Sequence, residues 1–170
     1  MRNISQRMED AIPYSGTFSW TLFERAQWRH LGYRWLFFLL IPVLMTAYAY
    51  FTSPTFPIVM WLTFLAVSIA SIPLIRGALR RQWRKMYKNS PYLLDPVSGF
   101  VSAETFIAES ATGKTEMPWT RFVRVREGEG FLLLYPSPYM FHILAREFFV
   151  TEQAWEAARI YALRDAASAG

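Results

Sequence analysis

The sequence predicts an α+β membrane protein, in which a two-helix transmembrane hairpin is joined to a small antiparallel β-sheet domain with a C-terminal helix. Apolar residues make up 53% of the chain, and the stretch from Trp35 to Ile75 contains no Asp, Glu, Lys, Arg or His. A helix over that stretch would be about 60 Å long, enough for two crossings of a hydrocarbon core of roughly 30 Å. From Gly99 onward, short Val-, Phe- and Tyr-rich segments separated by Gly and Pro are typical of hairpins.

The segment before the apolar stretch, residues 1–32, is expected to be cytoplasmic and to contain an amphipathic helix. Thr21 and Glu24 have the spacing of a capping box, and apolar residues follow at helical intervals as far as Trp35. Residues 12–20 have the composition of a strand. Because Pro13 lacks a backbone donor, that strand could lie only at the edge of a sheet.

Two transmembrane helices are predicted within residues 33–76, at about 33–51 and 57–76. The turn between them contains Pro54 and Pro57, which disfavour helix. Both outer flanks are basic and the turn is uncharged, so the positive-inside bias places both termini in the cytoplasm. The polar side chains within the helices cannot titrate, which argues against a transporter. We therefore expect a multi-pass membrane anchor.

Residues 77–90 are expected to extend the second helix as a basic segment. Cations recur there every three to four residues and so cluster along a helix. Near a membrane surface each would attract anionic headgroups by about 1 kcal/mol, without selecting among lipids. The alternative is that they only fix the topology. The expected headgroup-contacting residues, called the basic stripe below, are Arg76, Arg80, Arg81, Arg84, Lys85 and Lys88.

The strands of the β-domain are expected within residues 91–170. Trp119, Val123 and Val125 share one phase of a predicted strand whose other face is mostly charged. Residues 131–135 are apolar without alternation, so we expect that strand to be covered on both sides.

A final amphipathic helix is predicted from Thr151, which suits the N-cap position. Its apolar arc includes Trp155 and Tyr161. A small antiparallel sheet followed by one amphipathic helix is the outline of a pleckstrin-homology-like (PH-like) domain.

Several motifs of this region resemble those of the YcxB-like proteins of bacteria. They are Tyr-Lys-Asn-Ser-Pro at 87–91, Pro-Trp followed by Phe-Val-Arg-Val within 118–125, and Ile-Leu-Ala-Arg-Glu-Phe-Phe at 143–149. Ala145 and Glu147 replace a proline and a basic residue that are usual in the family. The resemblance implies two membrane helices in the bacterial cytoplasmic (inner) membrane and a C-terminal cytoplasmic domain of bacterial PH type. The family-motif and core residues that it marks are Trp119, Val123, Val125, Ile143, Arg146, Phe149 and Trp155.

The sequence offers little chemistry for an enzyme. It contains no cysteine, and its two histidines, His30 and His142, have no metal-ligand spacing around them. No paired carboxylates, catalytic triad or Gly-rich phosphate loop can be proposed. Arg124 and Arg126 are interpreted as the solvent face of a strand, because acidic residues follow them directly. We expect no enzymatic activity, no cofactor and no metal.

Charge distribution argues against nucleic acid as a partner, because residues 91–170 hold ten acidic residues against seven basic ones. The leading hypothesis is a membrane-anchored PH-like interaction module that presents the β-domain at the cytoplasmic face of the inner membrane. Its partners would be anionic headgroups and an unknown protein or a second copy of the chain. The alternative is an accessory structural subunit of a larger membrane protein complex, packing through its helical hairpin.

Overall fold

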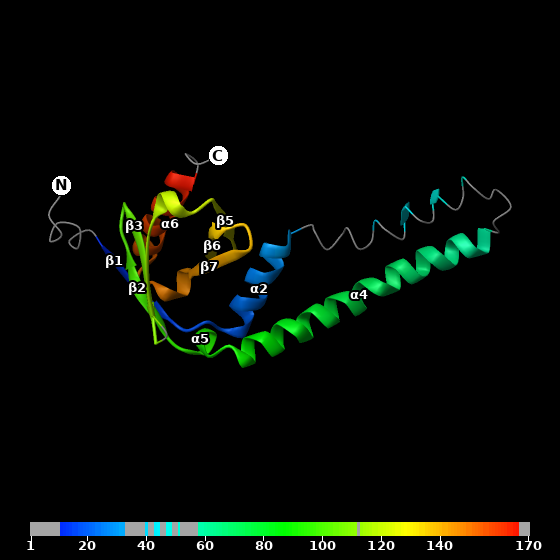
Figure 1. Cartoon of the computed structure of the whole chain (residues 1–170), viewed down its shortest axis with the longest axis horizontal. Helices are drawn as coiled ribbons and strands as arrows, with labels where there is room; N and C mark the ends of the chain where they lie inside the picture. The colour runs from blue at the N-terminus through cyan, green and yellow to red at the C-terminus, as the bar shows by residue number, and fades with distance from the viewer. Residues whose placement is uncertain are drawn as a thin grey trace. The chain divides into compact units, whose positions relative to one another are not determined.

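The computed structural model describes residues 11–32, 40, 43–44, 47–48, 51, 58–111 and 113–166. The chain forms two compact units (Figure 1). Unit 1 combines Met1–Ala26 with Tyr87–Gly170, and unit 2 is Gln27–Met86. The expected boundaries, at residues 33, 77 and 91, differ from this division. The expected boundaries follow changes in composition along the chain. Unit 1 instead combines two segments that are far apart in the sequence.

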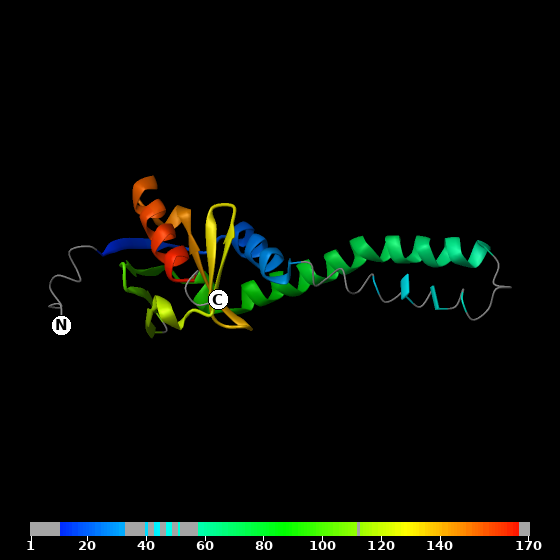
Figure 2. The same ribbon diagram turned by 90° about the horizontal axis from the view of Figure 1, so that it is seen from above.

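Unit 1 contains two antiparallel sheets and a C-terminal helix (Figures 1 and 2). One sheet has the order β1-β2-β3-β4 and the other the order β5-β6-β7. The strands of the first are β1 (Ile12–Gly16), β2 (Val97–Val101), β3 (Thr105–Ser110) and β4 (Gly113–Pro118). Those of the second are β5 (Arg124–Gly128), β6 (Phe131–Ser137) and β7 (Met140–Ala145). The closing helix is α6 (Glu152–Ala166).

Strand β1 belongs to the core of unit 1 although some 80 residues separate it from its neighbour β2. It lies at the edge of its sheet, as Pro13 requires, and pairs with β2 from Ile12 opposite Val101 to Gly16 opposite Val97. The buried ring of Tyr14 stacks on Phe106 with centroids 6.0 Å apart. Its hydroxyl donates a hydrogen bond of 3.0 Å to the backbone oxygen of Ile107.

Gly99 makes room for this tyrosine. A Cβ atom at position 99 would lie 1.9 Å from the backbone oxygen of Ile107 and 2.8 Å from the Tyr14 ring. Either approach is too close for a real side chain, so the crossing of Tyr14 over β2 requires glycine there.

Helix α2 (Trp20–Leu31) begins before Thr21, the residue predicted to cap it. The Ser19 hydroxyl accepts a hydrogen bond of 3.2 Å from the amide of Leu22, so Ser19, and not Thr21, caps the helix. The first half of α2 lies beside the sheet β5-β6-β7 (Figures 1 and 2). Leu22, Phe23 and Ala26 are buried. The expected separate N-terminal segment is therefore, up to Ala26, a part of the β-domain unit.

Strand β6 is buried at every position from Phe131 to Tyr135, as its unbroken apolar run predicted. Across from β6, the ring of His142 on β7 lies 5.8 Å from that of Phe106 on β3, so side chains of the two sheets meet in the core. Helix α2 lies beside the same sheet. Together, β3, β7 and α2 supply the neighbours of β6, so this strand needs no polar face.

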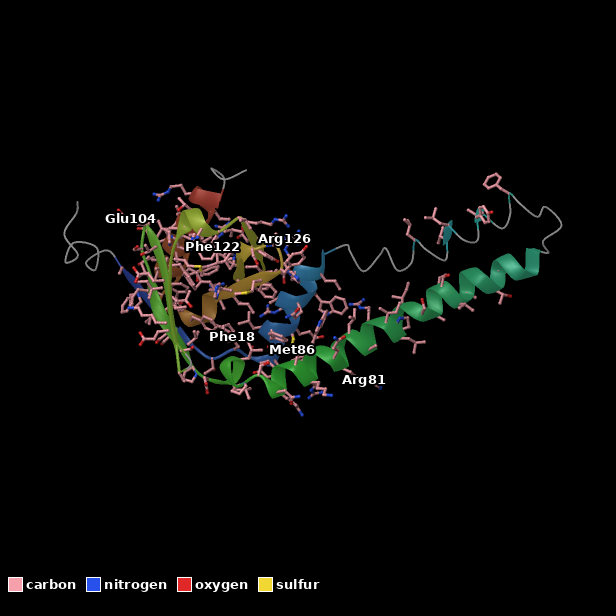
Figure 3. The ribbon with its side chains drawn as sticks, in the orientation of Figure 1. Phe18, Arg81, Met86, Glu104, Phe122 and Arg126 are labelled. Carbon is pink, nitrogen blue, oxygen red and sulfur yellow. The ribbon has the colours of Figure 1, made fainter. Side chains whose placement is uncertain are left out.

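The segment around Trp119 is a 3-10 turn and not the predicted strand. The turn η2 spans Trp119–Arg121, and β5 starts only at Arg124. Residues three apart lie on the same side of a 3-10 helix, and Trp119 and Phe122 are both buried. Figure 3 labels Phe122. Val123 is 59% exposed, and its assignment to the core is wrong.

Helix α6 closes the unit. The Thr151 hydroxyl accepts a hydrogen bond of 3.2 Å from the amide of Ala154, so the predicted N-cap is confirmed. The helix packs on η2 and β5, and Trp155, Ala158 and Ala162 form its buried side. On the partly exposed side, the Arg159 guanidinium bridges Glu127 on β5 and Glu156.

Helix α4 (Ile58–Asn89) contains most of the described residues of unit 2. Within this unit, Trp28 and Trp83 meet edge to face, with ring centroids 4.8 Å apart and an interplanar angle of 82°. The short helix α5 (Pro91–Leu94) follows α4 in unit 1.

The predicted transmembrane hairpin is wrong. Within the residues that the structure describes, no helix combines the length and the apolar character that crossing a bilayer requires. The same finding overturns the predicted multi-pass location in the bacterial inner membrane. The prediction treated 57–76 as a crossing and 77–90 as a separate basic extension, whereas α4 joins the apolar residues and the six cations in one helix. The first predicted crossing, 33–51, falls mostly outside the described residues.

The interior position of His142 predicts a pH-dependent stability. Burial lowers the pKa of this imidazole below its ordinary value of 6.5. Below pH 6.5 the unfolded chain therefore binds a proton that the folded chain resists, so the free energy of unfolding falls as the pH drops. Urea melts between pH 8 and pH 5 should show a falling midpoint, and His142→Gln should flatten that dependence. An equal slope in the variant would assign the effect to other groups.

Candidate functional site

The basic stripe lies along α4, and all six of its cations are exposed. At 100° per residue they cover about half of the helix circumference. The Arg76 guanidinium stands 5.0 Å from the centroid of the Trp28 ring, a cation–π contact within unit 2. Figure 3 labels Arg81 on the same helix. The sequence pattern predicted that these residues lie on one helix, but it did not predict the contact between Arg76 and Trp28.

The family-motif residues divide into a buried and an exposed group. Trp119, Ile143, Phe149 and Trp155 are buried, and Val125 is half-buried. Val123 and Arg146 are exposed. The motif therefore marks mainly the core, together with one exposed arginine.

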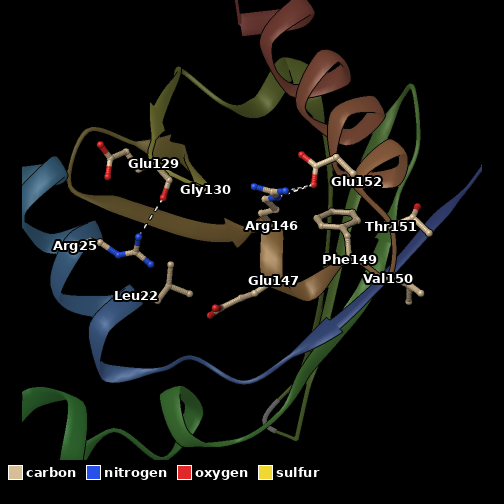
Figure 4. A pocket seen from close by; sticks show the side chains of 10 residues that line it. All are labelled: Leu22, Arg25, Glu129, Gly130, Arg146, Glu147, Phe149, Val150, Thr151 and Glu152. Carbon is tan, nitrogen blue, oxygen red and sulfur yellow. Dashed lines mark hydrogen bonds and ion pairs between the residues drawn. The ribbon is translucent and has the colours of Figure 1, made fainter.

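Arg146 lines a pocket of about 370 Å³ in unit 1 (Figure 4). Its walls come from α2, from the turn between β5 and β6, and from the segment that joins β7 to α6 through the 3-10 turn η3 (Arg146–Phe148). The lining residues are Leu22, Arg25, Glu129, Gly130, Arg146, Glu147, Phe149, Val150, Thr151 and Glu152.

Two apolar side chains give the pocket its fixed part. Leu22 and Phe149 are buried. The Phe149 ring is held between Tyr14, at a centroid distance of 5.8 Å, and Trp155, at 5.7 Å. At the rim, Val150 is 93% exposed. Val150 therefore extends the apolar lining of the pocket to its exposed rim.

The charged groups of the pocket are held differently. Arg146 is held by Glu152, whose Oε2 accepts hydrogen bonds from Nε at 2.6 Å and lies 2.5 Å from Nη2. Arg25 donates from Nη1 to the backbone oxygen of Glu129 over 3.4 Å, a long hydrogen bond. In Figure 4 the Arg25 guanidinium and the Glu147 carboxylate border the same open space, with Leu22 between them.

Sequence reasoning identified Arg146 and Phe149 but missed Leu22, Arg25 and Val150. Arg25 and Glu129 are 104 positions apart in the chain. No local pattern can bring such residues together. Nothing in the local sequence indicated that Val150, directly after the Phe-Phe pair, is exposed.

Arg124 and Arg126 lie over an aromatic ring. Each guanidinium is 6.0 Å from the centroid of the buried Tyr135 ring. They therefore also cover part of the core, and are more than the solvent face that the sequence indicated. Within the described residues, no group of three or more His, Asp or Glu side chains could hold a metal ion.

Residues 101–159, from the end of β2 to the middle of α6, match one family model. That model describes the YcxB-like protein. The predicted resemblance to the YcxB-like family is confirmed over this segment, which includes η2, the second sheet and the Arg146 side of the pocket. No curated protein and no solved structure matches the chain. The PH-like outline therefore stays a prediction. The pocket combines residues of the YcxB-like segment with Leu22 and Arg25, which lie outside it.

Proposed function

We propose that the chain is a non-enzymatic interaction module, whose YcxB-like β-domain presents a contact surface to a protein partner. The observation that carries this proposal is the pocket of unit 1. It combines a fixed apolar floor, an exposed aliphatic rim and two arginines. Arginine and aromatic residues such as Phe149 are enriched in protein contacts. A second copy of the chain is included among the possible partners.

Site-specific photo-cross-linking in the native host tests the proposal. A photoreactive benzoyl-phenylalanine at Val150 should give one discrete adduct, identifiable by mass spectrometry. The matched control is the same residue at Ile160, another exposed aliphatic position, 59% exposed, that does not line the pocket. Adducts of equal yield from both positions, or none from position 150, would count against the module.

A second candidate function is an accessory subunit of a larger protein complex, which packs through α4. The exposed large apolar side chains of this helix favour it, because Leu62 and Leu74 are 61% and 73% exposed. Exposed apolar surface of this kind is usually covered by a partner. Replacing both leucines with Gln should then abolish co-purification of the complex, while Arg25→Gln in the pocket should not. The opposite pattern would favour the pocket.

The basic stripe is proposed to contact anionic lipid headgroups without selecting among them. Its cations are exposed along one side of a helix, as surface attraction requires. Replacing Arg80, Arg81, Arg84 and Lys85 with Gln should weaken sedimentation with phosphatidylserine vesicles, most clearly at low salt. A strong preference for one phosphoinositide over vesicles of equal charge would reject the non-selective interpretation.

A further inference from the structure

The pocket of unit 1 has a specific charge pattern. Two arginines and three glutamates line it, but their roles differ. Arg146 and Glu152 neutralise each other. Figure 4 shows the Glu129 carboxylate directed away from the Arg25 guanidinium, although the Glu129 backbone accepts its hydrogen bond. The charges that border the open space are therefore those of Arg25 and Glu147.

Arg25 has hydrogen-bonding capacity in reserve. Within the part of the chain that the structure describes, its guanidinium makes one hydrogen bond, to the Glu129 backbone. A guanidinium carries five N–H donors in a planar fork that matches a carboxylate. Leu22, on the same helix one turn earlier, is buried at the base of the pocket. A carboxylate at Arg25 would thus lie beside an apolar surface.

We propose that this pocket binds an acidic, aliphatic peptide segment of the partner, in which a carboxylate pairs with Arg25 and a neighbouring apolar side chain rests on Phe149 and Val150. This inference rests on the proposed function. The volume of about 370 Å³ accommodates a few side chains. Glu147 lies close by and disfavours a polyanion, so a single carboxylate suits the site better than an inositol phosphate or a nucleic-acid backbone.

Helix α2 supplies the part of the pocket that determines its preference for a carboxylate. The YcxB-like segment supplies Gly130, Arg146 and Phe149, whereas the carboxylate-binding group comes from α2, outside that segment. The peptide preference is therefore a property of this chain's N-terminal helix placed on the β-domain, and not of the matched segment alone.

Titration of the full chain with blocked tripeptides tests the inference. The probe is N-acetyl-Leu-Asp-Leu-amide, followed through the amide signal of Gly130 and the methyl signals of Val150 in NMR spectra. Its matched control is N-acetyl-Leu-Asn-Leu-amide, which keeps the shape and lacks the charge. We expect saturable shifts at both positions and about tenfold weaker binding of the Asn peptide, a difference of about 1.4 kcal/mol, because hydrogen bonds to charged groups are stronger than those between neutral groups.

Variants of the chain isolate the role of Arg25. Arg25→Gln should weaken binding of the Asp peptide about tenfold and leave binding of the Asn peptide unchanged. Arg25→Lys should restore part of the difference in affinity between the two peptides. Arg121→Gln, an exposed position that does not line the pocket, is the control and should change neither. Dispersed spectra of each variant verify its folding.

Three outcomes would overturn the inference: equal affinity for the Asp and Asn peptides, an Asp affinity indifferent to Arg25→Gln, or larger shifts with inorganic phosphate than with the peptide. If Val150 cross-links to a protein while the tripeptide fails to bind, the interaction module stands and the peptide chemistry falls. If both experiments fail, the proposed function falls with it.

Discussion

Removing residues 1–16 from the chain should unfold the β-domain of unit 1, although the YcxB-like segment begins only at residue 101. The deletion removes β1 and, with it, the buried Tyr14 ring and its hydrogen bond to Ile107. Loss of a buried aromatic side chain alone costs about 3 to 5 kcal/mol, and a domain of this size has roughly 5 to 15 kcal/mol in total. The unpaired edge of β2 adds to that loss.

Hydrogen exchange, compared between the intact and the truncated chain, measures the effect within unit 1. Peptides from β2, β3 and β7 should lose their protection in the truncated chain. Tyr14→Ala should have most of the same effect. Tyr14→Phe keeps the ring and should lose only about 1 kcal/mol for the hydrogen bond. Ser15→Ala, at an exposed position of the same strand, is the matched control and should be neutral. Full protection of β2 in the truncated chain would show that residues 91–170 fold independently.

The same strand shows what could be predicted from the sequence and what could not. Pro13 restricted the strand predicted within residues 12–20 to a sheet edge, and the shorter β1 lies at such an edge. The partner of that edge was not predictable, because β2 lies beyond both long helices in the chain. Local patterns report which face of a segment is apolar, but not which distant segment covers it. The same limit explains why α2 was assigned to a separate N-terminal segment and why Arg25 was missed.

One prediction within the family motif is wrong because the backbone there forms a 3-10 turn. The alternation of Trp119, Val123 and Val125 suggested a strand, yet the chain makes a 3-10 turn first and buries Phe122 in place of Val123. A change of period within a few residues is invisible to a pattern with a single period. The apolar run of β6 and the cap at Thr151 needed no such change, and both predictions are confirmed. The charge-free stretch, in contrast, led to the transmembrane hairpin that the described helices contradict.

Trp119→Ala should destabilise unit 1 by about 3 to 5 kcal/mol, the usual cost of truncating a buried aromatic side chain. Trp119 is 2% exposed, and its ring contacts Phe106 and Phe122 at centroid distances of 6.1 and 5.7 Å. Its indole nitrogen donates a hydrogen bond of 2.8 Å to the backbone oxygen of Ser102. Truncation would therefore leave both a cavity and a carbonyl without its partner.

The neighbouring Val123 provides the matched control, because it belongs to the same motif and is 59% exposed. Val123→Ala should change the free energy of unfolding by less than about 0.5 kcal/mol. Trp119→Phe keeps most of the apolar volume and should fall between the two, so the series separates packing from the hydrogen bond to Ser102. Hydrogen exchange of β3 and α6 in the full-length variants gives the three values. An unshifted protection in Trp119→Ala would reject the core assignment, and Trp119 would then become the leading interaction residue of the YcxB-like segment.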